Sequence, residues 1–456
     1  MTKSKVTIYV VQANRMTDDH LLLVDGHTLR SWGMAAHSAV QLRFGAMRLT
    51  VRVAPLGKPG QLRMSEGLAG RLGLHHGATL RIAFRPSSSL ILLGPVIGIL
   101  VPYIFPHQPD RLFGGITSWC REVIEASRRQ GAFVYFFTPG GIAKQGNQLE
   151  GWTYAGGWRK GAFPIPDIIH NRLTSRKFEN RSNVQKLFKE SKEKHGSEIF
   201  NEKYLDKTEV FAALKKLPSL QSYLPESHAF MGMETLKAMA TKYRILFLKP
   251  IRGSLGKGII RIQRLAGGGF ACHFSEQTGT RKVVSATLSH VYSLLSPRFR
   301  AQKFQIQQGL PIATAASRPV DFRALVQKGL TGKWELTSLM GRIAGPHHFV
   351  SNLAKGGVVT PARTAINRAN IPLSRKGVAI KELQKAALLI ANGVDATIEA
   401  HFGELGIDLA VDRTGRVWLL EVNSKPSKND QLPQMEGKIR PSVKMLISYA
   451  RYLARL

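Results

Sequence analysis

The chain has 456 residues, of which 43% are hydrophobic and 21% are charged, a composition that supports packed domains and argues against a disordered protein. Its two cysteines, Cys120 and Cys272, lie far apart, which argues against a disulfide framework and a cysteine-based zinc site. The formal net charge of +35 indicates a generally basic surface. Acidic residues are interleaved with the lysines from Arg181 to Lys216, so we expect no dedicated nucleic-acid-binding segment.

The N-terminal sequence MTKSKVTIYVV contains neither a signal-peptide core nor a cleavage site of small residues. The most hydrophobic run, from Leu90 to Phe105, carries Gly and Pro and is shorter than the ~20 residues needed to span a bilayer. We interpret this run as one or two buried strands. The sequence therefore predicts a soluble intracellular protein without a membrane span.

Three regions follow one another along the chain. Residues 1–88 contain short alternating runs that predict a small β-rich unit, ending in a linker near Arg85. Residues 89–190 predict an α/β domain, with a helix from Ile116 to Arg129 and a strand from Ala132 to Phe137 in a mostly parallel sheet. Residues 191–456 mix helices with antiparallel strands. No internal repeat or low-complexity tract is recognised.

A glycine-rich loop joins two predicted strands, one from Arg244 to Lys249 and one beginning at Ile259. Such a loop allows close approach of the backbone to phosphates, and consecutive N–H groups can bind an anion. It is not a Walker A motif, because Ile251 and Gly258 occupy its diagnostic positions, nor a Rossmann fingerprint, because a strand follows it. The candidate phosphate-binding residues are Lys249, Gly253, Ser254, Gly256, Lys257 and Gly258. The alternative is a plain hairpin loop, although a buried Lys249 would need an anionic partner.

Three oxygen-bearing side chains, Asp408, Glu421 and Asn423, lie on a predicted hairpin with a turn at Asp412–Gly415. If the turn joined Val411 to Arg416, Asp408 would face Leu419, and Glu421 would lie diagonally beside Asp408 on the same face. A bulge would alter this register. Hard oxygen ligands of this kind suit Mg²⁺ held together with phosphates. The alternative is a polar, solvent-facing stripe on an edge hairpin.

Two arginines and an asparagine complete the polar candidates. Arg323 shares a strand face with Asp321, Arg342 follows another apolar run, and Asn352 precedes a pair of glycines. The planar guanidinium group suits a γ-phosphate or a developing acyl phosphate, because it binds two oxygens at once. The alternative is that Asp321 and Arg323 form structural ion pairs with neighbouring residues. The pair His347-His348 lacks a third ligand at useful spacing, which argues against zinc.

Taken together, these motifs resemble the ATP-grasp superfamily, and more closely its endospore coat-associated family labelled YheC/YheD. The resemblance covers roughly residues 90–445 and depends on the order and spacing of the motifs. It implies an ATP-grasp fold, of the α/β (α+β) class, with a preceding small α/β domain, and the N-terminal β-rich unit predicted above comes before both. The predicted divisions are residues 1–88, 89–190 and 191–456.

The resemblance also implies roles for individual residues. Lys207 and Lys249 would contact the nucleotide phosphates, and Arg342 and Arg323 would act near the γ-phosphate and the acyl phosphate. A hinge strand, with Gln305 and Gln307, would offer backbone groups to the adenine, although glutamine replaces the acidic residue that many relatives use for the ribose. Asn352 would join the nucleotide site. The ligands of Mg²⁺ would be Asp408, Glu421 and Asn423.

The implied function is a carboxylate–amine ligase that uses ATP and Mg²⁺ and forms an acyl phosphate. Its carboxylate and amine substrates are open, and a peptide or protein acceptor is among them. The implied location is the cytoplasm, with spore-coat association as a further expectation. The alternative is a structural protein of the spore coat that binds ATP without catalysing ligation.

Overall fold

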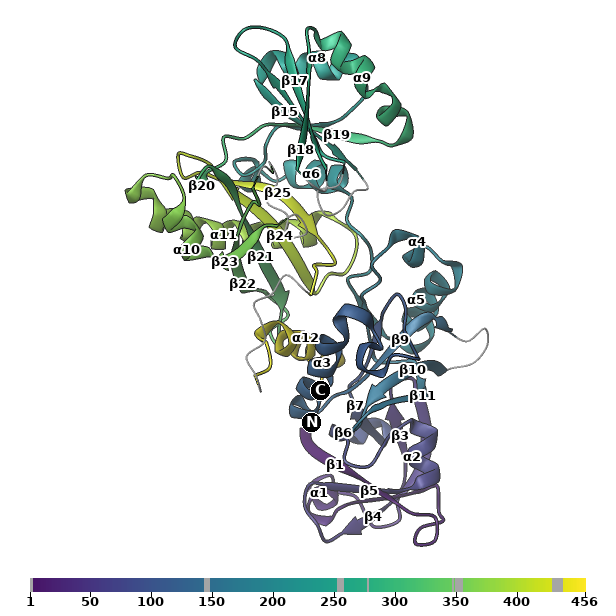
Figure 1. Cartoon of the computed structure of the whole chain (residues 1–456). Coiled ribbons are helices and arrows are strands. Elements are labelled where there is room, and N and C mark those ends of the chain that lie inside the picture. Colours follow the sequence, from purple (N-terminus) through teal and green to yellow (C-terminus); the bar gives the residue numbers. More distant parts are fainter. Residues whose placement is uncertain are drawn as a thin grey trace.

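The protein is described by a computed structural model that covers residues 3–142, 148–251, 258–276, 279–346, 348, 356–428 and 438–456. Its strands form a closed barrel and three further sheets, which we name after one member strand each: the β8 sheet, the β15 sheet and the β24 sheet. Figure 1 shows the barrel at one end of the molecule and the β15 sheet at the other.

The N-terminal region forms the closed barrel, with the strand order β1-β5-β2-β4-β3-β7-β6. Its strands are β1 (Lys3–Val11), β2 (Leu21–Asp25), β3 (Ala39–Phe44), β4 (Met47–Leu56), β5 (Gln61–Ser65), β6 (Thr79–Arg85) and β7 (Leu90–Gly94), and its helices are α1 (Gly26–Ser31) and α2 (Glu66–Leu72). Inward-facing aliphatic residues at every second position fill the barrel, as alternation along a strand requires.

Two copies of one strand–strand–helix–strand unit, β1-β2-α1-β3 and β4-β5-α2-β6, build most of the barrel. The strand pairings of the two copies are related by symmetry. Strand β1 pairs in parallel with β5, as β4 does with β2, and the pairs β1–β6 and β4–β3 are both antiparallel. Both helices have a side-chain N-cap, Asp25 and Ser65, and both are followed by a left-handed glycine, Gly33 and Gly73. The prediction that the chain contains no internal repeat is therefore wrong. Few paired residues are identical, and only caps, turns and burial are shared.

The segment that we predicted to be a linker, Arg85 to Ser89, instead contains the end of β6 and the turn that leads into β7. Strand β7 pairs with β6 on one side and with β3 on the other, and so closes the barrel. The sequence Pro-Ser-Ser-Ser thus forms a tight connection between β6 and β7, with a 3-10 turn at Pro86–Ser88. The predicted buried strands after it are confirmed as β7 and β8 (Val96–Leu100).

The β8 sheet has the order β11-β10-β9-β8-β12-β13, and its strands β9, β8, β12 and β13 are mutually parallel, which confirms a mostly parallel sheet. The further strands are β9 (Phe133–Ile142), β10 (Gln148–Tyr154), β11 (Trp158–Pro164), β12 (Ile168–Asn171) and β13 (Glu198–Phe200). Its helices are α3 (Thr117–Gln130), which confirms the predicted helix, with α4 (Arg176–Glu179), α5 (Ser182–His195) and α12 (Pro441–Ala454). One face shares a core with the barrel and α5, and α3 and α12 cover the other. Short 3-10 turns lie at Pro109–Arg111 and Gly114–Ile116.

The β15 sheet has the order β14-β19-β15-β16-β17-β18. Its strands are β14 (Ser227–Ala229), β15 (Ile245–Pro250), β16 (Ile260–Arg264), β17 (Phe270–Ser275), β18 (Thr280–Ser285) and β19 (Phe304–Gln308). The antiparallel pair β15–β16 confirms the two strands predicted around the glycine-rich segment. Helices α8 (Met233–Lys242) and α9 (Leu288–Ala301) pack on one face of this sheet. They share a core there with aliphatic side chains of the strands, such as Leu246 of β15 and Ile306 of β19.

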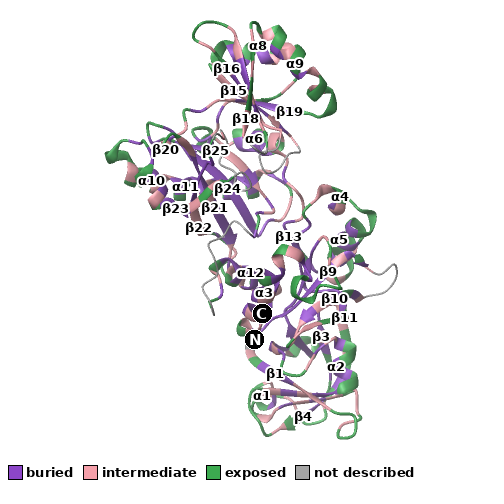
Figure 2. Cartoon of the chain, viewed as in Figure 1, coloured by how far each residue is buried: buried purple, intermediate pink, exposed green. Residues whose placement is uncertain are grey.

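The β24 sheet has the order β23-β22-β21-β24-β25, and β20 pairs with β21. Its strands are β20 (Thr314–Ala315), β21 (Arg318–Lys328), β22 (Trp334–Ile343), β23 (Val358–Pro361), β24 (Glu404–Val411) and β25 (Val417–Asn423). Four helices share its core: α6 (Lys207–Lys215), α7 (Pro218–Gln221), α10 (Ala362–Arg368) and α11 (Leu373–Thr397). Figure 2 shows β24 buried along its length, so polar side chains there lie inside the molecule.

Candidate functional site

The hairpin of β24 and β25 carries the predicted oxygen ligands. Asp408 lies directly opposite Glu421, and Asn423 follows two residues later on the same face. A bulge between Asp408 and Leu409 shifts the ladder, so that Leu409 pairs with Leu419 in the core. The predicted register, in which the turn joins Val411 to Arg416 and Leu419 faces Asp408, is wrong for two reasons: Val411 pairs with Val417, and the bulge then shifts the ladder by one further residue. The predicted shared face of the two carboxylates is confirmed, because the bulge reverses the alternation of β25.

Two arginines from the neighbouring strands hold Asp408. Arg323 of β21 donates from Nε and Nη2 to the two carboxylate oxygens, the second at 3.1 Å. Arg342 of β22 lies 3.0 Å from Oδ2 of Asp408, and its Nε donates to Oδ1 of Asp321 at 2.5 Å. Asp321 and Arg323 thus both form ion pairs with residues of neighbouring strands, as the structural alternative predicted, and Arg342 takes part in them as well.

The arginines fix the charge of Asp408. Burial alone would raise its pKa, but the positive charges of Arg323 and Arg342 and their hydrogen bonds outweigh burial and lower the pKa to about 2. Asp408 is only 8% exposed, yet it stays ionised at neutral pH. The sequence predicted that a cation balances this carboxylate. The guanidinium groups of Arg323 and Arg342 contribute positive charge of this kind.

Lys207 comes from the start of α6, where Asp206 caps the helix. Its Nζ lies 3.2 Å from Oε1 of Glu421, so this predicted phosphate ligand reaches the carboxylate hairpin. The side chains of Lys207 and Glu421 are 12% and 28% exposed, which leaves both accessible to a ligand. The structure thus brings Lys207 and Glu421 together, as the resemblance implies.

Lys249 and the two glutamines lie on the face of the β15 sheet that α8 and α9 leave uncovered. Lys249 pairs with Gln305 across the ladder, and its Nζ donates to Oε1 of Gln307 at 2.5 Å. Burial lowers the pKa of Lys249 to about 8; the charge of Lys207 acts in the same direction, and Glu421 and Asp408 oppose it. The two sheets therefore place their charged faces within electrostatic reach of each other.

Gln307 offers a further polar group. The residue is 2% exposed, and its Nε2 has no hydrogen-bond partner among the residues that the structure describes. A buried amide without a partner is unfavourable by about 1–3 kcal/mol. A ligand with an acceptor atom at this face would remove that penalty. The resemblance implies backbone contacts of this strand with the adenine, and a contact of the side-chain amide would be additional to them.

Several predicted site residues fall on parts of the chain outside the described residues: Gly253, Ser254, Gly256, Lys257 and Asn352, together with His347. Gly258, at the end of the glycine-rich segment, is described and has a φ of 72°. In the described ranges, no group of three or more His, Cys, Asp or Glu residues is placed to hold a metal ion. A magnesium site at the hairpin would thus need Asn423 as well as the two carboxylates.

The sequence motifs did not predict a second buried cluster, centred on Glu404 at the start of β24. Glu404 is 1% exposed and accepts hydrogen bonds from Lys428 at 2.6 Å and from Arg172 at 3.0 Å. His170 lies 3.6 Å away and is fully buried. Because Arg172 follows β12, this cluster fastens the β8 sheet to the β24 sheet. Arg172 and Glu404 lie in different regions of the sequence, so no local motif could reveal their contact.

Among the described residues, no helix is both long and apolar enough to cross a membrane.

Two sheets that face each other through a lysine-bearing strand and a carboxylate hairpin define the ATP-grasp class of proteins. The model of the family described as YheC/D like ATP-grasp matches residues 196–453, more than half of the chain. The chain therefore belongs to this family, and the predicted fold is confirmed.

Curated relatives and solved structures resemble the chain at low identity. The endospore coat-associated protein YheD of Bacillus subtilis (strain 168) is 27% identical over 80% of this chain and 80% of its own length. YheC of the same strain is 23% identical over 65% of this chain and 81% of its own. The ATP-grasp ligase PsnB with a minimal precursor has 14% identity and a TM-score of 0.45, covering 78% of this chain and 99% of its own. The D-alanine-D-alanine ligase from Coxiella burnetii has 12% identity and a TM-score of 0.44, covering 79% and 95%.

Proposed function

We propose that the chain binds ATP between the β15 and β24 sheets and uses it to join a carboxylate to an amine. The observation that carries this proposal is the meeting of Lys207 and Lys249 with Asp408 and Glu421, from two facing sheets and a helix end. Lysines beside carboxylates of a metal-binding type suit a polyphosphate that arrives with its cation.

The charge balance of the described residues supports an anionic ligand. Side-chain cations outnumber carboxylates at this site, where the two sets are Lys207, Lys249, Arg323 and Arg342 against Asp321, Asp408 and Glu421. Desolvated positive charge without an equal counter-charge is unfavourable, and the lowered pKa of Lys249 reflects this. A triphosphate would supply the missing negative charge.

The oxygens of Asp408, Glu421 and Asn423 would hold Mg²⁺, and the ion would neutralise charge on the phosphates when bound. In the proposed reaction, a carboxylate oxygen of the substrate attacks the γ-phosphorus, and ADP leaves. The amine nitrogen then forms a bond to the acyl carbon, loses a proton and displaces phosphate. The lysines of α6 and β15 would orient the phosphates, and the arginines of β21 and β22 would stabilise negative charge on the transferring group.

A second function is favoured by a specific observation. The ion pairs of Asp408 with Arg323 and Arg342 link three strands of the β24 sheet, as in a protein that needs these residues only for its architecture. The names of YheD and YheC describe coat-associated proteins. The second candidate is thus a coat-associated structural protein that binds ATP without ligation. In this alternative Glu421 still contributes to binding, and only turnover is absent.

Titration calorimetry of ATP, with and without Mg²⁺, tests the proposal on the full chain. We expect Mg²⁺-dependent binding that weakens roughly tenfold or more in Glu421→Ala, since loss of a charged ligand removes about 1.4 kcal/mol or more. Glu335→Ala, which removes an exposed carboxylate of β22, is the matched control and should bind like the wild type. Absence of ATP binding by the wild type would overturn the proposal. Binding without ADP release from any mixture of acids and amines would favour the structural alternative.

A further inference from the structure

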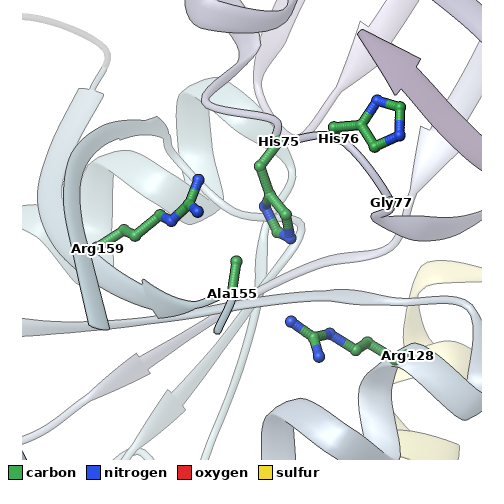
Figure 3. A pocket seen from close by; sticks show the side chains of 6 residues that line it. All are labelled: His75, His76, Gly77, Arg128, Ala155 and Arg159. Carbon is green, nitrogen blue, oxygen red and sulfur yellow. The ribbon is translucent and has the colours of Figure 1, made fainter. Parts of the chain in front are cut away.

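A pocket of about 330 Å³ lies away from the candidate ATP site, where the barrel meets the β8 sheet. It is lined by His75, His76 and Gly77 from the loop between α2 and β6, by Arg128 of α3, and by Ala155 and Arg159 of the β10–β11 hairpin. Figure 3 shows the side chains of His75, Arg128 and Arg159 directed toward one another, whereas His76 points away. The volume is at the lower end of the ~300–1,000 Å³ that small-molecule sites occupy.

The pocket is basic and has no carboxylate among its described lining residues. Carboxylates do lie on the same elements, but each has another partner. Glu125 of α3 pairs with Arg129 at 2.8 Å, and Glu122 pairs with Arg440. Glu150 of β10 pairs with Lys160 at 2.9 Å. Within the described part of the chain, the two arginines of the pocket therefore face it without a counter-charge.

The basic groups keep free hydrogen-bonding capacity. Arg128 is anchored by one bond, from Nη2 to the carbonyl oxygen of Tyr154 at 2.6 Å, which orients its guanidinium group. Among the described residues, no hydrogen bond or ion pair involves the side chain of Arg159. The Nδ1 atom of His75 is buried and also lacks a hydrogen-bond partner there. Two guanidinium groups and an imidazole thus converge with donors unused.

Burial and the neighbouring positive charges lower the pKa of His75. Burial lowers its pKa to about 4, and the positive charges of Arg128 and Arg159 and the neighbouring His76 act in the same direction. His75 is therefore neutral at physiological pH, with one ring nitrogen able to donate. Each positive charge of the pocket disfavours protonation of the neighbouring basic groups, and a bound anion would offset this repulsion.

The barrel repeat shows that the fold does not require these histidines. When Gly73 is aligned with Gly33, His75 and His76 correspond to Ala35 and Ala36 in the first copy. Both copies then continue with a left-handed residue, His37 in the first with φ of 63° and Gly77 in the second with φ of 82°. The first copy thus builds the same turn with alanine. The histidine of the second copy faces the two arginines of the β8 sheet, a surrounding that the first copy lacks.

We propose that this pocket binds a small anion through a phosphate or carboxylate group held by Arg128, Arg159 and His75. The guanidinium fork suits the paired oxygens of either group. Because the lining comes from the barrel and from the β8 sheet, the bound anion would join the two. This site is separate from the ATP site and does not depend on the function proposed above.

Titration calorimetry of the full chain with inorganic phosphate, and separately with citrate, tests the proposal without any nucleotide. We expect saturable binding that weakens roughly tenfold or more in Arg159→Gln and in His75→Ala, because each loses a hydrogen bond to a charged group. Arg48→Gln removes the same charge from an exposed site on β4 and should leave binding unchanged. His75→Ala should keep its thermal unfolding transition, since Ala35 occupies the equivalent position.

The two anions separate the possible ligand groups: binding of phosphate alone assigns a phosphate ligand, and binding of citrate alone assigns a carboxylate ligand. Absence of saturable binding of either anion by the wild type would overturn the proposal. Equal affinities of Arg159→Gln and the wild type would also overturn it, because anions would then be attracted by the basic surface in general. Equal weakening in Arg48→Gln and Arg159→Gln would have the same meaning.

Discussion

Asp408 of β24 lies directly opposite Glu421 of β25, although Leu419, two residues before Glu421, lies in the core. In a regular strand, residues two apart share a face, so Glu421 would point into the core with Leu419. The bulge beside Leu420 inserts one residue and reverses the alternation. Leu419 can thus pack at 0% exposure while Glu421 reaches Lys207. The geometry of the site depends on this single irregularity.

The first prediction concerns the buried pair of Arg342 and Asp321. We expect Arg342→Met to lower the free energy of unfolding by about 3–5 kcal/mol, because it removes a guanidinium group that two buried carboxylates, Asp321 and Asp408, share. Urea unfolding measures this change. The double variant Asp321→Asn/Arg342→Met should lose less than the sum of the single variants, since the buried carboxylate is removed together with the arginine that it contacts. Arg413→Met, an exposed arginine of the β24–β25 turn, should change stability by less than about 0.5 kcal/mol. Equal tolerance of both arginine substitutions would contradict the prediction.

The second prediction concerns Lys249, whose pKa burial lowers to about 8. Below that pH the free protein carries the positive charge, and above it the ammonium group deprotonates. A bound triphosphate would raise this pKa, so binding takes up a proton and ATP affinity should fall by up to about tenfold per pH unit above about pH 8. Calorimetry between about pH 7 and 9.5 measures this slope. Lys249→Met should bind more weakly and without the slope, and a flat wild-type profile would contradict the assignment.

The elements of the candidate site could be predicted because its chemistry is local in sequence. Asp408, Glu421 and Asn423 lie on one hairpin, and Lys249 ends an apolar strand, so residue type and spacing suffice to find them. The register of the hairpin could not be predicted, because it depends on a turn in which Asp412 bonds to Arg416 and on a bulge that lets Leu419 pack into the core that β25 shares with α11. For the same reason the sequence did not show that one arginine of β22 contacts carboxylates on both β21 and β24.

The barrel repeat and the Glu404 cluster could not be predicted from the sequence, for two different reasons. The barrel repeat keeps only a burial pattern, two caps and two left-handed turns, and these features are common in unrelated sequences. The Glu404 cluster joins distant parts of the sequence through the packing of the β8 sheet against the β24 sheet. Its members, such as Arg172 and Lys428, look like ordinary surface charges until the fold brings them together.

The third prediction concerns His170, which is fully buried beside Glu404 and stacks on Phe200. Burial lowers its pKa from 6.5 to about 4, with Arg172 and Lys428 acting in the same direction and Glu404 opposing them. The unfolded chain therefore takes up a proton first as the pH falls. The stability from this group is present above pH 6.5 and is lost toward pH 4 at about 1.4 kcal/mol per pH unit.

Urea unfolding across this pH range, on wild type and on His170→Phe, measures the contribution. The variant keeps the ring stack and cannot titrate, so its stability should depend less steeply on pH. Other groups also titrate there, and the difference between the two proteins isolates His170. His290→Gln, an exposed histidine of α9, should retain the wild-type slope. Parallel profiles for the wild type and His170→Phe would show that His170 does not contribute.

The fourth prediction uses the barrel repeat as its own control. Gly33 and Gly73 follow α1 and α2 at equivalent positions, with φ of 67° and 70°. A Cβ at Gly33 would meet nothing within 4 Å, whereas at Gly73 it would lie 2.9 Å from the carbonyl oxygen of Ala162 and 2.9 Å from Cδ1 of Phe163. Both alanine variants carry the left-handed penalty of about 1–2 kcal/mol. Gly73→Ala should lose a further 1–3 kcal/mol, roughly, because it forces the barrel away from β11.

Urea unfolding of the two variants measures the difference directly, since the backbone penalty is shared and cancels. The extra loss in Gly73→Ala reports how tightly the barrel is held against the β8 sheet, at the edge that also borders the basic pocket. Gly73→Ala should therefore weaken anion binding there as well, whereas Gly33→Ala should not. Equal stabilities of the two variants would mean that the barrel is free to move at this contact, and that the pocket is not held in shape by it.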